Sequence, residues 1–237
     1  MKYLEEITTD RTWICERTGV YKVTCVGGGS TGVLTIAGSM FFGKGGITKF
    51  GDMLSANGGT ANGKGVYIDN NSDSANIKVG GVGGYTAYCY GVAGVEVRNT
   101  SNPYASSASL NGGNAGVTGY GYGAGGGAEG TTCRVSCTNT SGTATTAAAY
   151  FYPLSGEAGD LRVGIFELKS GQSIPIQIGD GGIKDTMDFS NVNTLLGSIL
   201  TSYRNLNSSS ANIGTCKANV TNGLSGICVI EYLGDAF

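Results

Sequence analysis

The residues best suited to chemistry in this chain of 237 residues are carboxylates, because the sequence contains no histidine. Without histidine, Ser-His and Cys-His nucleophilic sites are excluded, and the commonest general base and metal ligand is missing. A glycosidase would instead need two carboxyl groups about 5 to 9.5 Å apart across a cleft. The carboxylates worth testing for this role are Glu157 with Asp160, and Asp180, Asp185 and Asp188 in GDGGIKDTMD (179–188).

Turn and surface roles fit these acidic residues better than catalysis does. The three aspartates lack the alternate-position spacing and the closing glutamate of an EF-hand loop, so a calcium site is not expected. We predict that the protein is not an enzyme and has no catalytic residue, no metal site and no cofactor. A polysaccharide depolymerase is the enzymatic alternative.

Cysteine is the second residue type that could do chemistry. The seven cysteines are Cys15, Cys25, Cys89, Cys133, Cys137, Cys216 and Cys228. Their number is odd and they lack the CxxC pairs of zinc and redox sites, so small buried thiols are favoured over a disulfide framework. Cys133 and Cys137, in CRVSC, could face one another or pair with Cys216 or Cys228.

Tyrosines within glycine-rich sequence are the best candidates for a binding function. They are Tyr85, Tyr88, Tyr90, Tyr120 and Tyr122. A rigid aromatic face with a hydroxyl group can stack on a sugar ring or anchor a protein contact at low entropic cost. The structural alternative is that these rings stack between glycine segments or across the interface of a trimer.

Composition excludes several classes of protein. Glycine supplies 43 residues, about 18% against a usual 7% or so, yet there are only three prolines and no Gly-X-Y period, so collagen is excluded. A formal charge of −2 gives no basic surface for nucleic acid. The opening MKYLEEITTDRTW is acidic where a signal peptide is basic, and no apolar run approaches the roughly 20 residues that span a bilayer. We therefore expect synthesis in a cytoplasm and no membrane insertion.

Short β-type runs bounded by glycine predict the regular elements. GVYKVTCV (19–26) alternates like a half-buried strand, and strands are also expected at 161–168, 173–179 and 226–233. The turn at Ser170 to Gln172 suggests that the strands at 161–168 and 173–179 form an antiparallel pair. Two segments could form short helices, at 49–57 and at 193–205.

Between these elements lies a long middle rich in Gly, Ser, Thr, Asn and Ala, which is either a flexible linker or an ordered glycine structure. Polyproline II chains have three residues per turn and no internal hydrogen bonds, so glycine-rich chains of this kind can bond to one another through the backbone. Gly113, Gly116 and Gly119 recur every third residue. The glycines to which we assign a structural role are Gly27, Gly28, Gly29, Gly45, Gly46, Gly113, Gly116, Gly119, Gly181 and Gly182.

Four stretches together resemble one known family. They are TWICERTGVYKVTCVGGG (12–29), FGKGGITKFGDMLSANGG (42–59), LKSGQSIPIQIGDGG (168–182) and GICVIEY (226–232). This combination resembles the glycine-rich domain of tailed-bacteriophage tail and fibre proteins, including the tail-fibre tip adhesins of T-even-like phages. The resemblance implies an all-β fold, a jelly-roll-like β-sandwich with glycine-rich loops or packed polyglycine II helices at one end. In those adhesins the loops between glycine helices contact the bacterial surface.

From these observations we expect an N-terminal arm at 1–11 followed by one glycine-rich β domain at 12–237. The expected function is that of a non-enzymatic virion protein, made in the host cytoplasm, that serves as a tail or fibre-tip receptor-binding component for a bacterial surface glycan or protein. The alternative is a purely structural virion subunit, such as a collar, head-fibre or decoration protein. Expected partners are other virion proteins, the bacterial receptor and further copies of the chain, with a homotrimer favoured.

Overall fold

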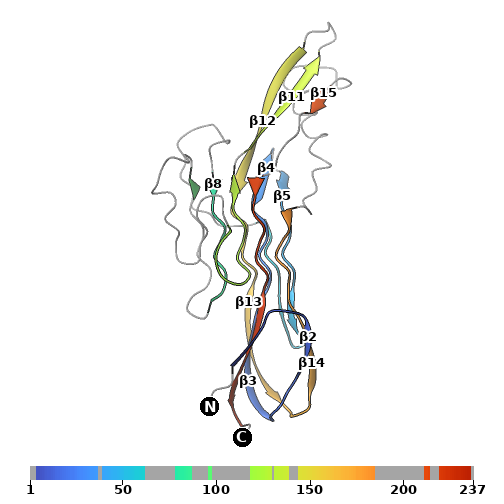
Figure 1. Ribbon diagram of the computed structural model, residues 1–237, viewed down its shortest axis with the longest axis vertical. Helices are drawn as coiled ribbons and strands as arrows, with labels where there is room; N and C mark the ends of the chain where they lie inside the picture. The colour runs from blue at the N-terminus through green and yellow to red at the C-terminus, as the bar shows by residue number, and fades with distance from the viewer. Residues whose placement is uncertain are drawn as a thin grey trace.

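The computed structural model describes residues 4–36, 39–61, 78–86, 96–97, 118–129, 131–138, 144–184, 211–213 and 219–235. The described residues form antiparallel sheets and contain no α-helix, so the predicted all-β class is confirmed. Figure 1 shows an elongated arrangement with β2, β3 and β14 at one end and β11, β12 and β15 at the other. Extended segments run side by side along the molecule between these two ends.

Two four-stranded sheets form the end that contains the first and last strands of the chain. The first sheet has the order β1 (Leu4–Ile7), β17 (Ile227–Gly234), β3 (Gly19–Val26) and β13 (Leu161–Leu168). The second has the order β2 (Arg11–Ile14), β14 (Ser173–Gln177), β6 (Thr48–Phe50) and β7 (Leu54–Ala56). Residues 4–7, which we assigned to an N-terminal arm, are therefore the edge strand β1 of the first sheet.

The other end of the described structure is made of two further sheets. One has the order β15 (Ala211–Ile213), β11 (Thr131–Thr138), β12 (Ala144–Leu154), β4 (Val33–Ile36) and β5 (Ser39–Phe41). The other joins four two-residue strands, β16 (Asn219–Val220), β10 (Ala128–Glu129), β8 (Lys78–Val79) and β9 (Glu96–Val97).

The first two sheets share one hydrophobic core, and we call this part of the molecule the sandwich. Alternation in β3 directs Tyr21, Val23 and Cys25 into the core, as the sequence predicts for residues 19–26. Trp13 packs edge-on against Tyr21, with ring centroids 5.6 Å apart, and lies 6.0 Å from the Phe50 ring. Burying each such large side chain contributes about 1.5 to 3 kcal/mol, so both sheets are held by the same cluster.

Three of the four predicted strands correspond closely to β3, β13 and β17, and the fourth, β14, ends two residues earlier than predicted. The helix predicted at 49–57 is wrong. Residues 48–56 instead form the hairpin of β6 and β7, because Gly51 has a φ of +52° that permits the tight turn. Alternation then buries Phe50 and Ala56 in the core. The helix predicted at 193–205 lies outside the described residues.

The expected pairing of the strands at 161–168 and 173–179 is also wrong. β13 pairs with β3, whereas β14 pairs with β2 and β6 in the facing sheet. The connection between β13 and β14 crosses from one sheet to the other. It is held by the connection between β2 and β3, since Gly171 N donates to Cys15 O and Cys15 N donates to Gln172 O. Crossing lets Leu168 and Ile174 enter the same core from opposite sheets.

Candidate functional site

The middle of the molecule is a set of glycine-rich segments joined by backbone hydrogen bonds outside any sheet. Its central segment is residues 27–32, whose N–H groups donate to three neighbouring segments in turn. The bonds run from Gly27 to Asp160, Gly28 to Gly46, Gly29 to Leu224, Ser30 to Glu157, Thr31 to Gly43 and Gly32 to Thr221, with N···O distances of 2.9 to 3.1 Å. Every third residue therefore bonds to the same neighbour.

Three more segments donate to the carbonyl groups of the central one. Gly59 N donates to Gly28 O at 2.8 Å, Gly182 N donates to Gly29 O at 2.7 Å and Gly126 N donates to Ser30 O at 2.8 Å. Six segments thus surround the seventh. Together they are residues 27–32, 43–46, 57–60, 123–127, 156–160, 179–183 and 221–226, and we call them the glycine bundle.

The six outer segments of the glycine bundle also bond to one another and close a ring. The bonds between adjacent outer segments include Gly45 N to Gly59 O, Asp160 N to Asn57 O, Gly156 N to Gly126 O, Leu224 N to Ala124 O, Gly223 N to Gly182 O and Gly46 N to Asp180 O. An eighth segment, 81–85, lies outside this ring and bonds to residues 120–125. Backbone N–H and C=O groups of the bundle lie outside any strand and therefore form their hydrogen bonds with neighbouring segments, as buried polar groups must.

Close approach of the backbones explains why these positions are glycine. A Cβ atom added at Gly27, Gly28 or Gly29 would lie 2.0 Å from the carbonyl oxygen of Asn57, Asp180 or Ala124, respectively. The same backbone crowding occurs at the predicted structural glycines Gly45, Gly46, Gly119, Gly181 and Gly182. Gly113 and Gly116 lie outside the described residues.

Hydroxyl side chains occupy the two positions of the central segment that are not glycine, and both are buried. Ser30 Oγ donates to Thr60 O at 2.8 Å, and Thr31 Oγ1 accepts from Gly43 N at 2.8 Å. At the junction with the sandwich, Thr48 Oγ1 donates to Val26 O at 2.6 Å and accepts from Gly179 N at 2.9 Å. None of these three residues is predicted from the sequence, because nothing in their local sequence distinguishes them from other Ser and Thr residues.

The carboxylates singled out for chemistry make structural contacts. Glu157 Oε2 accepts from Thr60 N at 3.1 Å and from Thr60 Oγ1 at 2.7 Å. Asp160 Oδ2 pairs with Arg162 at 3.2 Å. Asp180 is an exposed residue of the glycine bundle, whereas Asp185 and Asp188 lie outside the described residues. The Glu157 contacts tie segment 156–160 to segment 57–60.

Three of the candidate tyrosines, Tyr85, Tyr120 and Tyr122, lie together at the flank of the glycine bundle. Tyr120 is 57% exposed and Tyr122 is 38% exposed. Tyr85 forms an isolated antiparallel bridge with Tyr122, in which each N–H donates to the other's carbonyl at 2.8 and 3.0 Å. Gly121 and Gly123, with φ of +90° and +70°, give the chain the turns that place Tyr122 between them. Tyr88 and Tyr90 lie outside the described residues.

Tyr85 anchors this group on the outer face of the sandwich. Its ring packs against a small buried cluster made of Val26, Ile227 and Val229. Burial raises the pKa of the Tyr85 phenol, and the negative charges of Glu6 and Glu231 raise it further. Tyr85 therefore stays neutral and acts as a support, while Tyr120 and Tyr122 present their rings to solvent.

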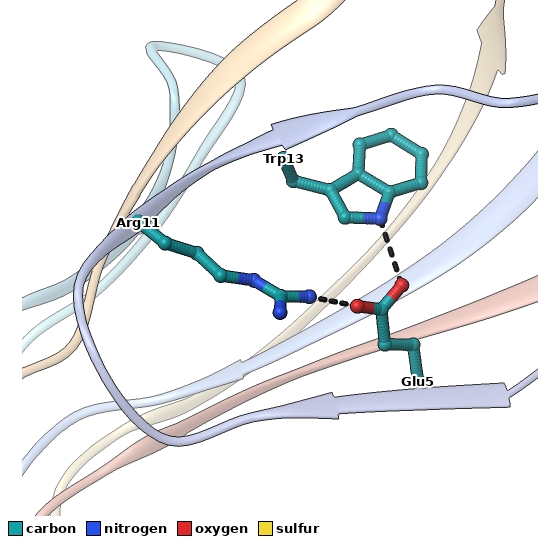
Figure 2. A network of polar contacts seen from close by, with 3 residues as sticks. All are labelled: Glu5, Arg11 and Trp13. Atoms are coloured by element: carbon teal, nitrogen blue, oxygen red, sulfur yellow. Dashed lines mark hydrogen bonds and ion pairs between the residues drawn. The ribbon is translucent and has the colours of Figure 1, made fainter.

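A polar network fixes the first two strands of the sandwich. Figure 2 shows the Glu5 carboxylate between the side chains of Arg11 and Trp13. Glu5 accepts a hydrogen bond from Trp13 Nε1 at 2.9 Å and forms an ion pair with Arg11. The buried indole N–H is thereby satisfied, so the network joins β1 to β2 across the sheet boundary and has a structural role.

The described cysteine side chains agree with the prediction of buried thiols. Cys15, Cys25 and Cys228 are buried and free. The sulfur beside Cys228 belongs to Cys25, so the suggested pairing of Cys228 with Cys133 or Cys137 is wrong. Cys133 and Cys137 lie in β11, while Cys89 and Cys216 lie outside the described residues.

The arrangement is that of an all-β scaffold whose glycine segments bond to one another and whose exposed aromatic groups are suited to binding. Within the described residues, no group of three or more His, Cys, Asp or Glu side chains could hold a metal ion. No helix in that part of the chain has the length and apolar character to cross a membrane. Comparison of the sequence with family models and curated proteins, and of the fold with solved structures, gave no match.

Proposed function

We propose that this protein is a non-enzymatic virion protein of a tailed bacteriophage, a tail or fibre-tip component that binds a bacterial surface glycan or protein. The observation that carries the proposal is the closed glycine bundle, in which residues 27–32 are bonded to six surrounding segments. A closed bundle of this kind can hold surface loops and aromatic side chains at fixed places.

We infer that the segments of the glycine bundle are polyglycine II helices. Their hydrogen bonds support this, because Gly27 and Ser30 bond to one neighbour, Gly28 and Thr31 to a second, and Gly29 and Gly32 to a third. That repeat matches the three residues per turn of a polyproline II helix, which has no internal hydrogen bonds and leaves its backbone groups to neighbours. The resemblance to phage tip adhesins points to the same arrangement.

The sandwich is, in this proposal, a jelly roll. Its eight strands, numbered 1 to 8 along the chain, are β1, β2, β3, β6, β7, β13, β14 and β17. In these numbers the first sheet has the order 1-8-3-6 and the second has the order 2-7-4-5. A jelly roll is built from eight antiparallel strands in two facing sheets that follow two Greek keys, and these two orders fit that description. The glycine bundle then lies in the connections at one end of the sandwich.

Receptor contact is assigned to the exposed tyrosines, with Tyr120 and Tyr122 as the contacting residues and Tyr85 as their support. The ring faces of Tyr120 and Tyr122 offer large rigid contact areas, and their hydroxyl groups can bond to sugars. Several copies on one particle would raise a modest affinity through avidity. The host bacterial cytoplasm is the proposed place of synthesis, and the virion the final location.

One observation favours the alternative of a structural virion subunit. β13 is an edge strand of the sandwich, and its Val163 and Ile165 side chains are 50% and 66% exposed. An exposed apolar edge strand is usually covered in natural proteins, and here another virion protein or a second copy would cover it. We assign this edge to the proposed homotrimer contact, a role that is compatible with receptor binding.

The test is binding of the fluorescently labelled protein to a panel of bacterial strains, with the oligomeric mass measured by light scattering. We expect saturable, strain-restricted binding that the double variant Tyr120→Ala/Tyr122→Ala weakens at least tenfold with little change in melting temperature. Ile14→Ala is the matched control, because Ile14 is equally exposed but lies on β2 of the sandwich.

Absence of binding by a well-folded oligomer across the panel would favour the structural subunit. Binding that the double variant leaves intact would remove the tyrosines from the site. Loss of stability in the double variant would assign these rings a packing role.

A further inference from the structure

Two cysteines face each other inside the sandwich and have no role in the proposed function. Cys25 in β3 and Cys228 in β17 are directly opposite partners in the antiparallel ladder. Both are fully buried, and Cys25 Sγ lies 3.8 Å from Cys228 Sγ. They lie on the third strand and the last strand of the chain, 203 positions apart in the sequence.

Their position satisfies the geometric requirement for a disulfide. Opposite residues in an antiparallel pair have Cα atoms about 4.5 or 5.5 Å apart, and disulfides accept Cα separations of about 4.4 to 6.8 Å. Side-chain rotation would bring the sulfur atoms from 3.8 Å to bonding distance. The third described cysteine, Cys15, lacks this arrangement, because its sulfur bonds to Arg17 O and Tyr21 Oη.

We propose that Cys25 and Cys228 are a disulfide-forming site that locks the first sheet of the sandwich when the protein meets an oxidising medium. The oxidant is a small-molecule disulfide such as oxidised glutathione. One cysteine thiolate attacks a sulfur of the oxidant, forming a mixed disulfide and releasing one small thiol. The second cysteine thiolate then attacks the protein sulfur of that mixed disulfide, releasing the second small thiol. Two cysteine thiols are oxidised, one small disulfide is reduced to two thiols, and the two cysteine protons pass to the released thiols.

The fold controls when this reaction occurs. The hydrogen bond with Cys25 and burial raise the pKa of the Cys228 thiol, so the reactive thiolate is scarce while the sheet is closed. Neither sulfur is open to a small molecule in the closed sheet. Oxidation therefore takes place during transient opening, and the bond is shielded from reducing thiols once the sheet has closed over it.

The disulfide would enclose nearly the whole functional structure. All seven segments of the glycine bundle lie between Cys25 and Cys228 in the sequence. Closing so long a loop removes much of the conformational freedom of the unfolded chain. We expect the linked protein to melt roughly 5 to 15 °C higher than the reduced protein.

Peptide mapping identifies the bond without ambiguity. Trypsin cleavage after Lys22, Lys44 and Lys217 gives peptides 23–44 and 218–237, each of which contains a single cysteine. The full chain is incubated with oxidised glutathione in urea below its unfolding midpoint, alkylated and digested without reduction. The expected product is peptide 23–44 joined to 218–237, lighter by about 2 Da than the sum of the two free peptides because two thiol hydrogens are lost.

Two variants serve as controls. Cys15→Ala removes a buried thiol outside the pair and should form the same linked peptide with the same rise in melting temperature. Cys228→Ala should form no linked peptide, and the oxidant should leave its melting temperature unchanged. The proposal is overturned if Cys25 and Cys228 are recovered separately alkylated, if either is joined to another cysteine, or if the linked protein melts below the reduced one.

Discussion

Replacing Gly29 with alanine tests whether the glycine bundle holds the molecule together. Gly29 lies in the central segment, where its N–H donates to Leu224 O at 2.9 Å and its carbonyl accepts from Gly182 N at 2.7 Å. An added Cβ would lie 2.0 Å from Ala124 O, whereas ordinary contacts begin at 3.4 Å. The two segments would therefore have to separate by about 1.4 Å, the difference between these distances.

The expected cost follows from what that separation breaks. Overpacking a well-packed interior costs about 1 to 3 kcal/mol. Each buried backbone hydrogen bond left unmade costs about 1 to 3 kcal/mol more, and a shift of this size lengthens the bond from Gly126 N to Ser30 O, which joins these two segments. We expect Gly29→Ala to lower the free energy of unfolding by about 4 kcal/mol and the melting temperature by roughly 8 to 16 °C.

Urea unfolding measures this difference with two probes. Trp13 is the single tryptophan of the chain and lies in the core of the sandwich, so its fluorescence reports on that part, while circular dichroism reports on the whole backbone. Gly171→Ala is the matched control, because Gly171 has a φ of +82° but no atom within 4 Å of an added Cβ. Only the cost of a left-handed backbone, about 1 to 2 kcal/mol, applies there.

A cost for Gly29→Ala no larger than that for Gly171→Ala would contradict this expectation. That result would mean that the central segment can move away from its neighbours without loss, so the bundle would not be a rigid scaffold. A large loss seen by circular dichroism but not by Trp13 fluorescence would instead show that the bundle and the sandwich unfold separately.

Three further predictions concern single side chains. Ser155 Oγ is buried with no hydrogen-bond partner among the described residues, so Ser155→Ala should leave stability unchanged or raise it by about 1 kcal/mol in urea unfolding, and a loss above that amount would contradict this. Burial, followed by the hydrogen bond with Cys15, raises the pKa of Tyr21, so the folded state keeps this proton and stability should fall as pH rises above about 10, the ordinary tyrosine value. Tyr21→Phe should make that fall less steep in urea titrations at pH 9 and 11, and an equal slope in both proteins would rule out Tyr21 as its source. Ile165→Lys should reduce the oligomeric mass measured by light scattering, whereas the same change at exposed Ile14 should not, and an unchanged mass for Ile165→Lys would place the oligomer contact elsewhere.

Elements with a local signal could be predicted from the amino-acid sequence. Alternation of polar and apolar residues fixes which face of residues 19–26 is buried, because side chains of a strand point to opposite faces with a period of two. The same signal located the strands at 161–168 and 226–233. The high glycine content left two interpretations, a flexible linker or an ordered structure, and the second was possible because glycine alone lets two backbones approach so closely. The tyrosine candidates followed from their glycine-rich surroundings, and the structure places Tyr85, Tyr120 and Tyr122 together.

Which segments become neighbours depends on long-range contacts that local sequence does not encode. The turn signal after β13 predicts that this strand is half of a hairpin. β13 instead pairs with β3, because crossing between sheets buries Leu168 and Ile174 in one core. Residues 49–57 lie in a hairpin because that arrangement buries Phe50 and Ala56 in the same core. The bundle depends on contacts between residues as distant as Gly29 and Leu224, which no local pattern encodes. The pairing of Cys25 with Cys228 has the same origin, since strand register places two distant residues side by side and sequence spacing does not reveal it.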